Sequence, residues 1–209
     1  MKVDPNMAPP LFWEQHYGKM TSATSGRPSA VLKRFVENRP TGTALELGCG
    51  RGDDAIWLAS KGWQVTAVDI SKTALDYARA NAKRSNVTSN IDFRTCDLVT
   101  DFPDGDYDLV SALFLESPVT FPREAVLKQA AAAVRSGGML LIAAHGPMPH
   151  SSAHSQNRVF LSPRQSLNQI DLDPAKWREV FVDTIDRPGT GPDGKAMDLT
   201  DTVIVIERI

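Results

Sequence analysis

The chain has 209 residues, and 23 Lys and Arg against 25 Asp and Glu leave a formal net charge of −2. This length suits one α/β domain with a well-buried core and is too short for two full domains of typical size. The basic residues are spread along the chain, which excludes the charge pattern of a protein that binds duplex nucleic acid, so a small-molecule partner is expected.

The first two thirds of the chain alternate between patterns typical of strands and of helices. Helices are predicted over 11–19, 29–38, 54–61, 71–84 and 123–134, and strands over 43–47, 64–68, 91–95, 107–113 and 139–144. Gly62 and the pair Gly137-Gly138 are expected to end helices, and Ser71 is expected to cap one. Such alternation implies right-handed crossovers and a parallel sheet that is covered on both faces.

The pattern changes after residue 144. Residues 145–157 are rich in Gly, Pro, Ser and His and form too long a stretch for an ordinary connection, so a mobile loop is predicted there. A short helix over 164–169 follows, and then two strand-like segments, 177–185 and 202–208, separated by a turn over 187–194. These two segments are expected to form an antiparallel hairpin at the edge of the sheet.

The most informative segment runs from Ala44 to Asp53, where an apolar strand ends in glycines and a helix begins directly afterwards. Glycines allow positive φ and let a ligand approach the main chain, and the start of a helix adds free N–H groups. The spacing is G-x-G-x-G, and Asp53 stands where the dinucleotide motif G-x-G-x-x-G has its third glycine, which disfavours a diphosphate. Glu46, two residues before the first glycine, suits a ligand with a cationic amino-acid end.

Two further strand ends carry carboxylates, Asp69 after the second strand and Asp97 after the third. In a doubly wound sheet ligands bind outside the C-terminal ends of the strands. A carboxylate at the second strand accepts hydrogen bonds from ribose hydroxyls, and one after the third accepts from the adenine amine. Asp69 and Asp97 together describe a site for adenosine. Asp69 alone is compatible with NAD, but Asp97 together with the G-x-G-x-G loop favours another ligand that contains adenosine.

Four segments together resemble the ordered motifs of class I S-adenosylmethionine-dependent methyltransferases. They are ELGCGRG at 46–52, VTAVDIS at 65–71, CDL at 96–98 and DYDLV at 106–110, within a match over 43–144. The flanks WEQHY at 13–17 and SGRP at 25–28, with the closing hairpin, resemble the small bacterial branch of tellurite-resistance and thiopurine methyltransferase-like proteins. The resemblance implies an α/β, Rossmann-like doubly wound sheet of seven strands, mostly parallel with an antiparallel C-terminal hairpin strand.

The resemblance also implies S-adenosylmethionine as the cofactor and a single methyltransferase domain over 1–209. Residues 1–40 would cover the cofactor and acceptor site, 43–144 would form the cofactor-binding core, and 145–209 would supply an acceptor loop and the closing hairpin. The expected cofactor-binding residues are Trp13, Tyr17, Arg27, Glu46, Gly48, Cys49, Gly50, Asp69, Ile70, Asp97, Leu98, Ala112 and Leu113. Trp13 and Tyr17 are equally explained as the apolar face of a helix, and Arg27 as a solvated loop residue or a partner of an acidic acceptor.

The sulfonium makes the methyl group electrophilic, so the protein mainly has to align a nucleophile with it. Thiols and metalloid oxyanions attack as anions, whereas a hydroxyl gains roughly 10²–10⁴-fold from a positioned base. His145, at the end of the fifth strand, is the candidate base; the alternative is a histidine that only hydrogen-bonds a loop. His145, His150 and His154 lack an acidic or Cys ligand among them, so no metal site is expected and a lid over the acceptor is favoured.

Two other functions stay open, an NAD(P)-dependent oxidoreductase and a non-catalytic S-adenosylmethionine-binding module that acts through a partner. The missing third glycine and the lack of an evident Tyr-x-x-x-Lys pair disfavour the oxidoreductase. The run LFLE at 113–116 differs from the Asn/Asp-Pro-Pro-aromatic tetrad common in nucleic-acid amino-methyltransferases. A small-molecule acceptor without nucleic acid is therefore expected.

The remaining expectations concern the protein's surroundings. The chain lacks a membrane-length apolar run and a signal-peptide pattern at its start, so it is expected to be soluble and cytoplasmic, without a membrane partner. Cys49 and Cys96 match no disulfide or metal spacing and are expected to be buried in a reducing compartment. A monomer or a homodimer is compatible with the sequence.

Overall fold

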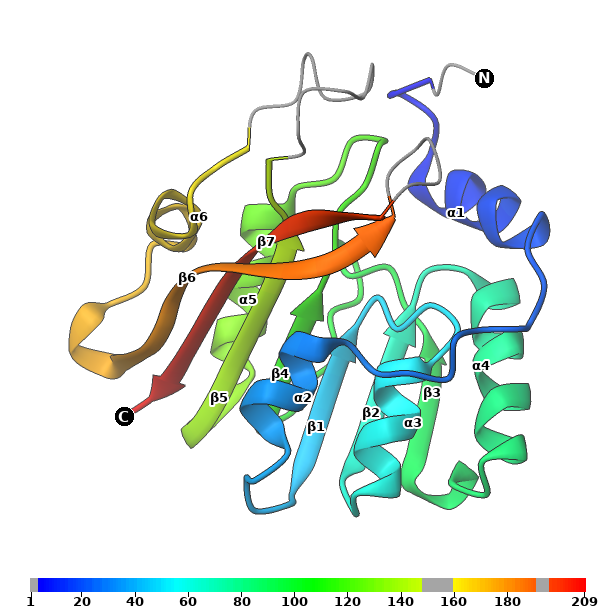
Figure 1. The fold of residues 1–209 in the computed structure, drawn as a ribbon, viewed down its shortest axis with the longest axis horizontal. Coiled ribbons are helices and arrows are strands. Elements are labelled where there is room, and N and C mark those ends of the chain that lie inside the picture. The colour runs from blue at the N-terminus through cyan, green and yellow to red at the C-terminus, as the bar shows by residue number, and fades with distance from the viewer. Residues whose placement is uncertain (1–3, 148–159, 191–195) are drawn as a thin grey trace.

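The structure, a computed structural model, describes residues 4–147, 160–190 and 196–209. Its strands form one seven-stranded sheet in the order β3-β2-β1-β4-β5-β7-β6 (Figure 1). The strands are β1 (Thr43–Leu47), β2 (Gln64–Asp69), β3 (Ile91–Thr95), β4 (Tyr107–Leu113), β5 (Val134–His145), β6 (Trp177–Thr190) and β7 (Ala196–Arg208). The helices are α1 (Pro9–Gly18), α2 (Ala30–Val36), α3 (Asp53–Ser60), α4 (Lys72–Arg84), α5 (Arg123–Ala132) and α6 (Pro163–Ile170), with short 3-10 turns at Thr88–Asn90 and Pro174–Lys176.

The direction of the strands confirms the predicted fold class. Strands β1 to β5 pair in parallel, and β7 lies antiparallel between β5 and β6. The chain moves outward from β1 to β3 and then returns to β4 on the other side of β1, so the strand order reverses between β1 and β4. At such a switch point the loops that leave the two strands diverge and open a crevice at the C-terminal edge.

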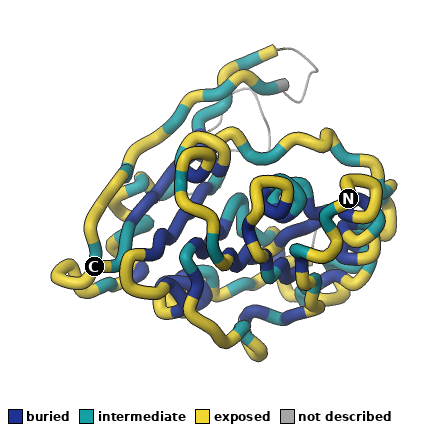
Figure 2. Tube along the Cα trace, turned by 90° about the horizontal axis from the view of Figure 1, so that it is seen from below, coloured by how far each residue is buried: buried dark blue, intermediate teal, exposed yellow. Residues whose placement is uncertain are grey.

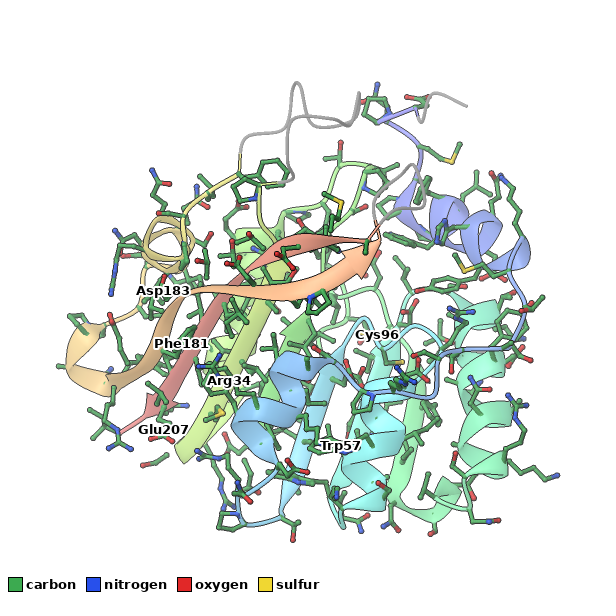
Figure 3. The ribbon with its side chains drawn as sticks, in the orientation of Figure 1. Arg34, Trp57, Cys96, Phe181, Asp183 and Glu207 are labelled. Carbon is green, nitrogen blue, oxygen red and sulfur yellow. The ribbon has the colours of Figure 1, made fainter. Side chains whose placement is uncertain are left out.

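Helices cover both faces of the sheet, as a parallel sheet requires. The apolar sides of α2, α3 and α4 pack on one face and those of α5 and α6 on the other, so each face has its own buried cluster. Figure 2, a tube along the Cα trace seen from below, shows buried segments running through the middle of the molecule and exposed segments around them. At the far edge, the guanidinium carbon of Arg34 in α2 lies 5.1 Å from the ring centre of Phe181 in β6, and Figure 3 shows the two side chains together.

Local signals in the sequence placed most element ends correctly. Ser71 precedes α4, and its hydroxyl accepts a hydrogen bond from the Ala74 N–H at 3.1 Å. The prediction for Gly137-Gly138 was wrong, because α5 ends at Ala132 and both glycines lie inside β5. Tyr107 pairs with Val134 but Leu109 pairs with Met139, so residues 135–138 bulge out of the strand. Gly137 has φ +80, and a Cβ on Gly138 would lie 2.8 Å from the Tyr107 carbonyl oxygen, which explains why glycines are needed.

The C-terminal hairpin is longer than the sequence suggested. Strand β5 ends at His145, which pairs with Asp201, but β6 and β7 continue to pair from Asp186 opposite Thr200 to the end of β6. Residues 187–190, predicted as turn, are therefore strand. Pro188 lies in β6, the edge strand of the sheet, where alternate N–H groups face away from the neighbouring strand and proline is tolerated. The hairpin forms an arm (residues 186–190 and 196–200) beyond the C-terminal end of β5 (Figure 1).

The predicted mobile loop lies mostly outside the described residues, as do His150 and His154. Within the described residues, no helix is both long enough and apolar enough to cross a membrane.

Candidate functional site

The turn from β1 into α3 brings the main chain close to its neighbours. Gly48, Gly50 and Gly52 all have positive φ, at +72, +53 and +86. A Cβ on Gly48 would lie 2.8 Å from Leu115 Cδ1, and one on Gly50 would lie 2.9 Å from Tyr17 Oη. The glycines therefore serve both the turn and the close approach of other groups to the backbone.

Asp69 at the end of β2 holds this turn in place. Its Oδ2 accepts a hydrogen bond from the Gly50 N–H at 2.8 Å, and its Oδ1 accepts one from the Ser71 N–H at 2.9 Å. The residue is only 6% exposed, and burial raises the pKa of its carboxyl, while the two hydrogen bonds act in the opposite direction. Each carboxylate oxygen has further lone-pair capacity that a ligand hydroxyl can use.

A first cavity of about 300 Å³ opens at the C-terminal ends of the strands beside Asp69. It is lined from the ends of β2 and β3, from α1, and from the segment after β4. The lining residues are Pro9, Trp13, Tyr17, Gly48, Asp69, Ile70, Cys96, Asp97, Leu98, Val99, Phe114, Leu115, Glu116, Ser117, Thr120, Phe121 and Pro122. The first cavity thus has carboxylates on one wall and mainly apolar side chains on the others.

A second cavity of about 270 Å³ shares Tyr17 and Gly48 with the first and extends toward α3. Its wall is acidic. It contains Glu46, Asp53 and Asp54 together with His16, Met20, Cys49, Arg51, Gly52 and Leu113. Glu46 Oε2 has no hydrogen-bond partner among the described residues, although Glu46 is only 5% exposed. Burial raises the pKa of this carboxyl well above its usual value, and the charges of Asp54 and Asp69 raise it further. The arrangement is one that a bound cation would stabilise.

Helix α1 covers the first cavity through polar contacts. None of its ten residues, all of which the structure describes, is buried. Glu14 accepts hydrogen bonds from the Ser71 hydroxyl at 2.7 Å and from the Thr73 hydroxyl, which fixes the helix to the start of α4. Trp13 and Tyr17 line the cavity from the same helix. Burial and the nearby Asp69 raise the pKa of the Tyr17 hydroxyl, so this residue stays neutral.

A third cavity of about 460 Å³ lies on the other side of Phe114, which lines both it and the first. Its wall comes from the start of α2, the residue after β4, the end of β5, the hairpin arm and β7: Ser29, Ala30, Val31, Phe114, His145, Arg187 and Asp201. Asp201 is 1% exposed and accepts from Arg187 Nε at 2.5 Å. The His145 ring nitrogen Nδ1 lies 2.5 Å from Glu116 Oε2.

The structure brings most of the predicted residues to these cavities, but not all. Ala112 is fully buried within β4 and lines none of these three cavities, whereas its neighbour Leu113 lines the second. Arg27 is exposed, and its backbone N–H donates to Ser25 Oγ at 3.2 Å. Cys49 and Cys96 are buried free thiols, in agreement with the sequence. Figure 3 shows Cys96 just beyond β3.

Two contributions were missed at the sequence level. Asp54 was not expected at the site, yet it lines the second cavity, accepts from the Ser29 N–H at 2.5 Å, and has a pKa raised to about 6 by burial. Phe114 lies at the junction of the first and third cavities with φ +55, rare for a bulky residue. Nothing in the sequence marks either residue. The described residues contain no cluster of three or more His, Cys, Asp or Glu side chains that could hold a metal ion.

The fold is that of a doubly wound α/β protein, and two neighbouring cavities lie at its switch point, with a glycine turn at one wall and acidic side chains at another. A family model described as a methyltransferase domain matches residues 44–138. Methyltransferase GfsG of Streptomyces halstedii is 30% identical over 149 residues, which cover 68% of this chain and 53% of that protein. Ribosomal protein L11 methyltransferase of Burkholderia mallei is 34% identical over 144 residues, which cover 68% and 41%. The chain thus spans about half the length of these relatives.

Solved structures share the fold at low sequence identity. N-methyltransferase NodS of Bradyrhizobium japonicum, in complex with S-adenosyl-L-homocysteine, superposes with a TM-score of 0.67 at 15% identity and covers 92% of this chain and 97% of its own. TehB of Haemophilus influenzae superposes with a TM-score of 0.64 at 18% identity, covering 94% and 67%. The matches to a methyltransferase domain and to methyltransferase relatives support a class I S-adenosylmethionine-dependent methyltransferase, the class whose cofactor is S-adenosylmethionine.

Proposed function

We propose that the protein transfers a methyl group from S-adenosylmethionine to a small-molecule acceptor. The observation that carries the proposal is that the first two cavities are neighbours that share Tyr17 and Gly48, with Asp69 in one and the unpartnered carboxyl oxygen of Glu46 in the other. An extended ligand with hydroxyls at one end and a cationic amino-acid group at the other matches this arrangement.

The first cavity suits the adenosine part of the cofactor. Asp69 would accept from the ribose hydroxyls, and Asp97 from the adenine amine. Asp97 Oδ1 also accepts from the Val99 N–H at 3.0 Å, which fixes the turn after β3. Ile70 and Leu98 provide apolar contacts for the ring, with Trp13 and Tyr17 as the cover from α1.

The second cavity suits the methionine part. Glu46 would receive the ammonium group, and the backbone at Gly48, Cys49 and Gly50 leaves room for the carbon chain because Gly48 and Gly50 lack a Cβ. Leu113 packs on this side of the site, and Ala112 supports it from within the sheet. Arg27 remains a proposed partner for the carboxylate, although it is exposed and does not line this cavity.

The third cavity would hold the acceptor. The bound cofactor supplies an electrophilic methyl group, and its sulfonium would lie where the first and second cavities meet, at Gly48. Phe114 lines both the first and the third cavity, so an acceptor in the third cavity would lie beside the cofactor site. His145 on its wall is the candidate base. A protein side chain as acceptor is the alternative favoured by the ribosomal protein methyltransferase among the relatives.

Calorimetric titration with S-adenosylmethionine, S-adenosyl-L-homocysteine and NADH tests the proposal. We expect micromolar binding of the first two and none of NADH, followed by formation of S-adenosyl-L-homocysteine when thiols, metalloid oxyanions and phenols are supplied. Binding of NADH alone would indicate an oxidoreductase, and binding of cofactor without turnover on any acceptor would indicate a non-catalytic module. Either result would overturn the proposed activity.

A further inference from the structure

The side chains of Glu116 and His145 form a pair that joins two of the cavities. Glu116 follows β4 and lines the first cavity, while His145 ends β5 and lines the third. His145 Nδ1 lies 2.5 Å from Glu116 Oε2, and the backbone N–H of His145 donates to the same oxygen at 3.1 Å. Two contacts to one oxygen fix the position of the carboxylate relative to the ring.

The chain after β4 is shaped so that Glu116 reaches His145. Phe114 adopts φ +55, and its N–H donates to the Ala143 carbonyl oxygen at 2.8 Å, which ties the end of β4 to β5. The N–H of Glu116 donates to the Phe114 carbonyl oxygen at 2.9 Å, so the chain reverses within these residues. The Phe114 ring lies 4.7 Å from the His145 ring and restricts its rotation. A left-handed backbone conformation is unfavourable for a bulky residue, and residues that adopt it cluster at functional sites.

These contacts determine which nitrogen of His145 carries the proton. The backbone N–H makes Glu116 Oε2 an acceptor, so the ring nitrogen beside it has to be the donor Nδ1–H. The opposite nitrogen, Nε2, is then unprotonated in the neutral ring and able to take a proton. The His145 side chain is 48% exposed while that of Glu116 is only 18% exposed. The ring is therefore accessible to a ligand and its carboxylate partner is shielded.

We propose that Glu116 is a positioning residue that holds His145 as the general base for a hydroxyl acceptor, which narrows the proposed function to O-methylation. As the acceptor oxygen forms its bond to the methyl carbon, the bond from that carbon to sulfur breaks and its electron pair stays on sulfur. The acceptor's proton moves to His145 Nε2. The positive charge of the sulfonium is thereby replaced by that of an imidazolium, which the Glu116 carboxylate stabilises. This inference rests on the proposed methyltransferase function.

The Glu116–His145 pair indicates the class of acceptor because acceptors differ in how much they gain from a general base. A thiol ionises readily and attacks as an anion, so a base contributes little to it. A phenol or other hydroxyl gains roughly 10²–10⁴-fold from a positioned base. A carboxylate–imidazole pair whose imidazole lies on the wall of the third cavity is therefore expected in a protein that methylates oxygen.

The first test uses the protein without cofactor, so its result does not depend on the methyltransferase activity. Nitrogen-15 NMR of the imidazole rings at alkaline pH reports which nitrogen carries the proton. We expect the Nδ1–H tautomer at His145 in the wild type and in Glu116→Gln, whose side-chain oxygen is held in place by the same backbone N–H. In Glu116→Ala we expect this preference to be lost. An Nε2–H tautomer in the wild type would overturn the proposal.

The second test compares rates with catechol and thiophenol as paired probes. We expect Glu116→Ala to lower kcat for catechol by about 10²-fold while thiophenol changes less than about threefold and the affinity for S-adenosyl-L-homocysteine is retained. Glu179→Gln is the matched control, since it removes a carboxylate paired with Arg164 near the start of β6 and should change neither rate. Equal losses on both probes would show a structural role for Glu116 and refute its positioning role. If the wild-type protein did not bind S-adenosyl-L-homocysteine, that result would instead refute the proposed function.

Discussion

Replacing Glu46 with glutamine should stabilise the free protein and weaken cofactor binding. Glu46 is 5% exposed, and its Oε2 lacks a partner among the described residues. A buried polar group without a partner costs about 1–3 kcal/mol, and more when it is charged. For a chain of this size, 1 kcal/mol corresponds to a change in Tm of about 2–4 °C. We therefore expect Glu46→Gln to raise Tm at pH 8 by at least about 2 °C.

The pH dependence follows from the direction of the pKa shift. Burial and the charges of Asp54 and Asp69 raise the pKa of Glu46 in the folded protein. A raised pKa means that the folded state retains the proton, so the stability of the wild type decreases as pH rises through the folded pKa. The stability advantage of Glu46→Gln should accordingly be near zero at pH 4 and grow toward pH 8.

Binding should respond in the opposite sense. Hydrogen bonds to charged groups contribute about 1.5–3 kcal/mol, so losing the proposed contact to the ammonium group corresponds to about 10- to 150-fold in affinity. Thermal unfolding at several pH values and calorimetric titration with S-adenosylmethionine measure the two effects. Glu37→Gln, at an exposed pair with Lys33, is a control expected to leave both unchanged. A variant that is destabilised at pH 8 and binds cofactor as well as the wild type would contradict the reasoning.

Three further changes test other parts of the site. Asp69→Ala leaves the buried N–H of Gly50 without its acceptor and should weaken S-adenosylmethionine binding by a few kcal/mol; an unchanged dissociation constant in calorimetry would remove Asp69 from the site. Gly50→Ala places a side chain at φ +53 and 2.9 Å from Tyr17 Oη, so it should cost about 1–2 kcal/mol in chemical denaturation and reduce affinity, whereas wild-type stability would show that the turn adapts. Asp201→Asn removes the charge of the buried Asp201, whose partner Arg187 has a side chain that is 30% exposed, and should lower the free energy of unfolding by about 1.5–3 kcal/mol in urea, an effect that an unchanged free energy would disprove.

Local sequence was a good guide wherever a short-range rule dominates. The bounds of β1, β3 and β4 and the Ser71 cap of α4 agree with the sequence, because strand periodicity, glycine turns and hydroxyl caps act over a few residues. The same rules misplaced Gly137-Gly138. A glycine pair after a helical pattern also fits a bulge, and only the pairing of β5 with β4 decides between the two.

The candidate site likewise has features that the sequence predicted and features that it did not. Carboxylates and glycines at strand ends could be placed together from the sequence, because parallel strands bring their C-terminal ends to one edge of the sheet. The sequence did not determine that Glu46 Oε2 has no partner among the described residues or that Asp54 shares the cavity of Glu46, since burial depends on what packs around a side chain.

The order and spacing of the motifs by themselves determined the class of protein, its cofactor and the doubly wound core. Only the tertiary structure decided that Glu116 contacts His145, that Phe114 lines both the first and the third cavity and that Arg187 of the hairpin arm lines the third. These contacts join residues far apart in the chain, from strands whose relative positions depend on packing of the whole sheet. Motif spacing reports the local path of the backbone, whereas the acceptor side of the site is formed by long-range contacts that the spacing does not contain.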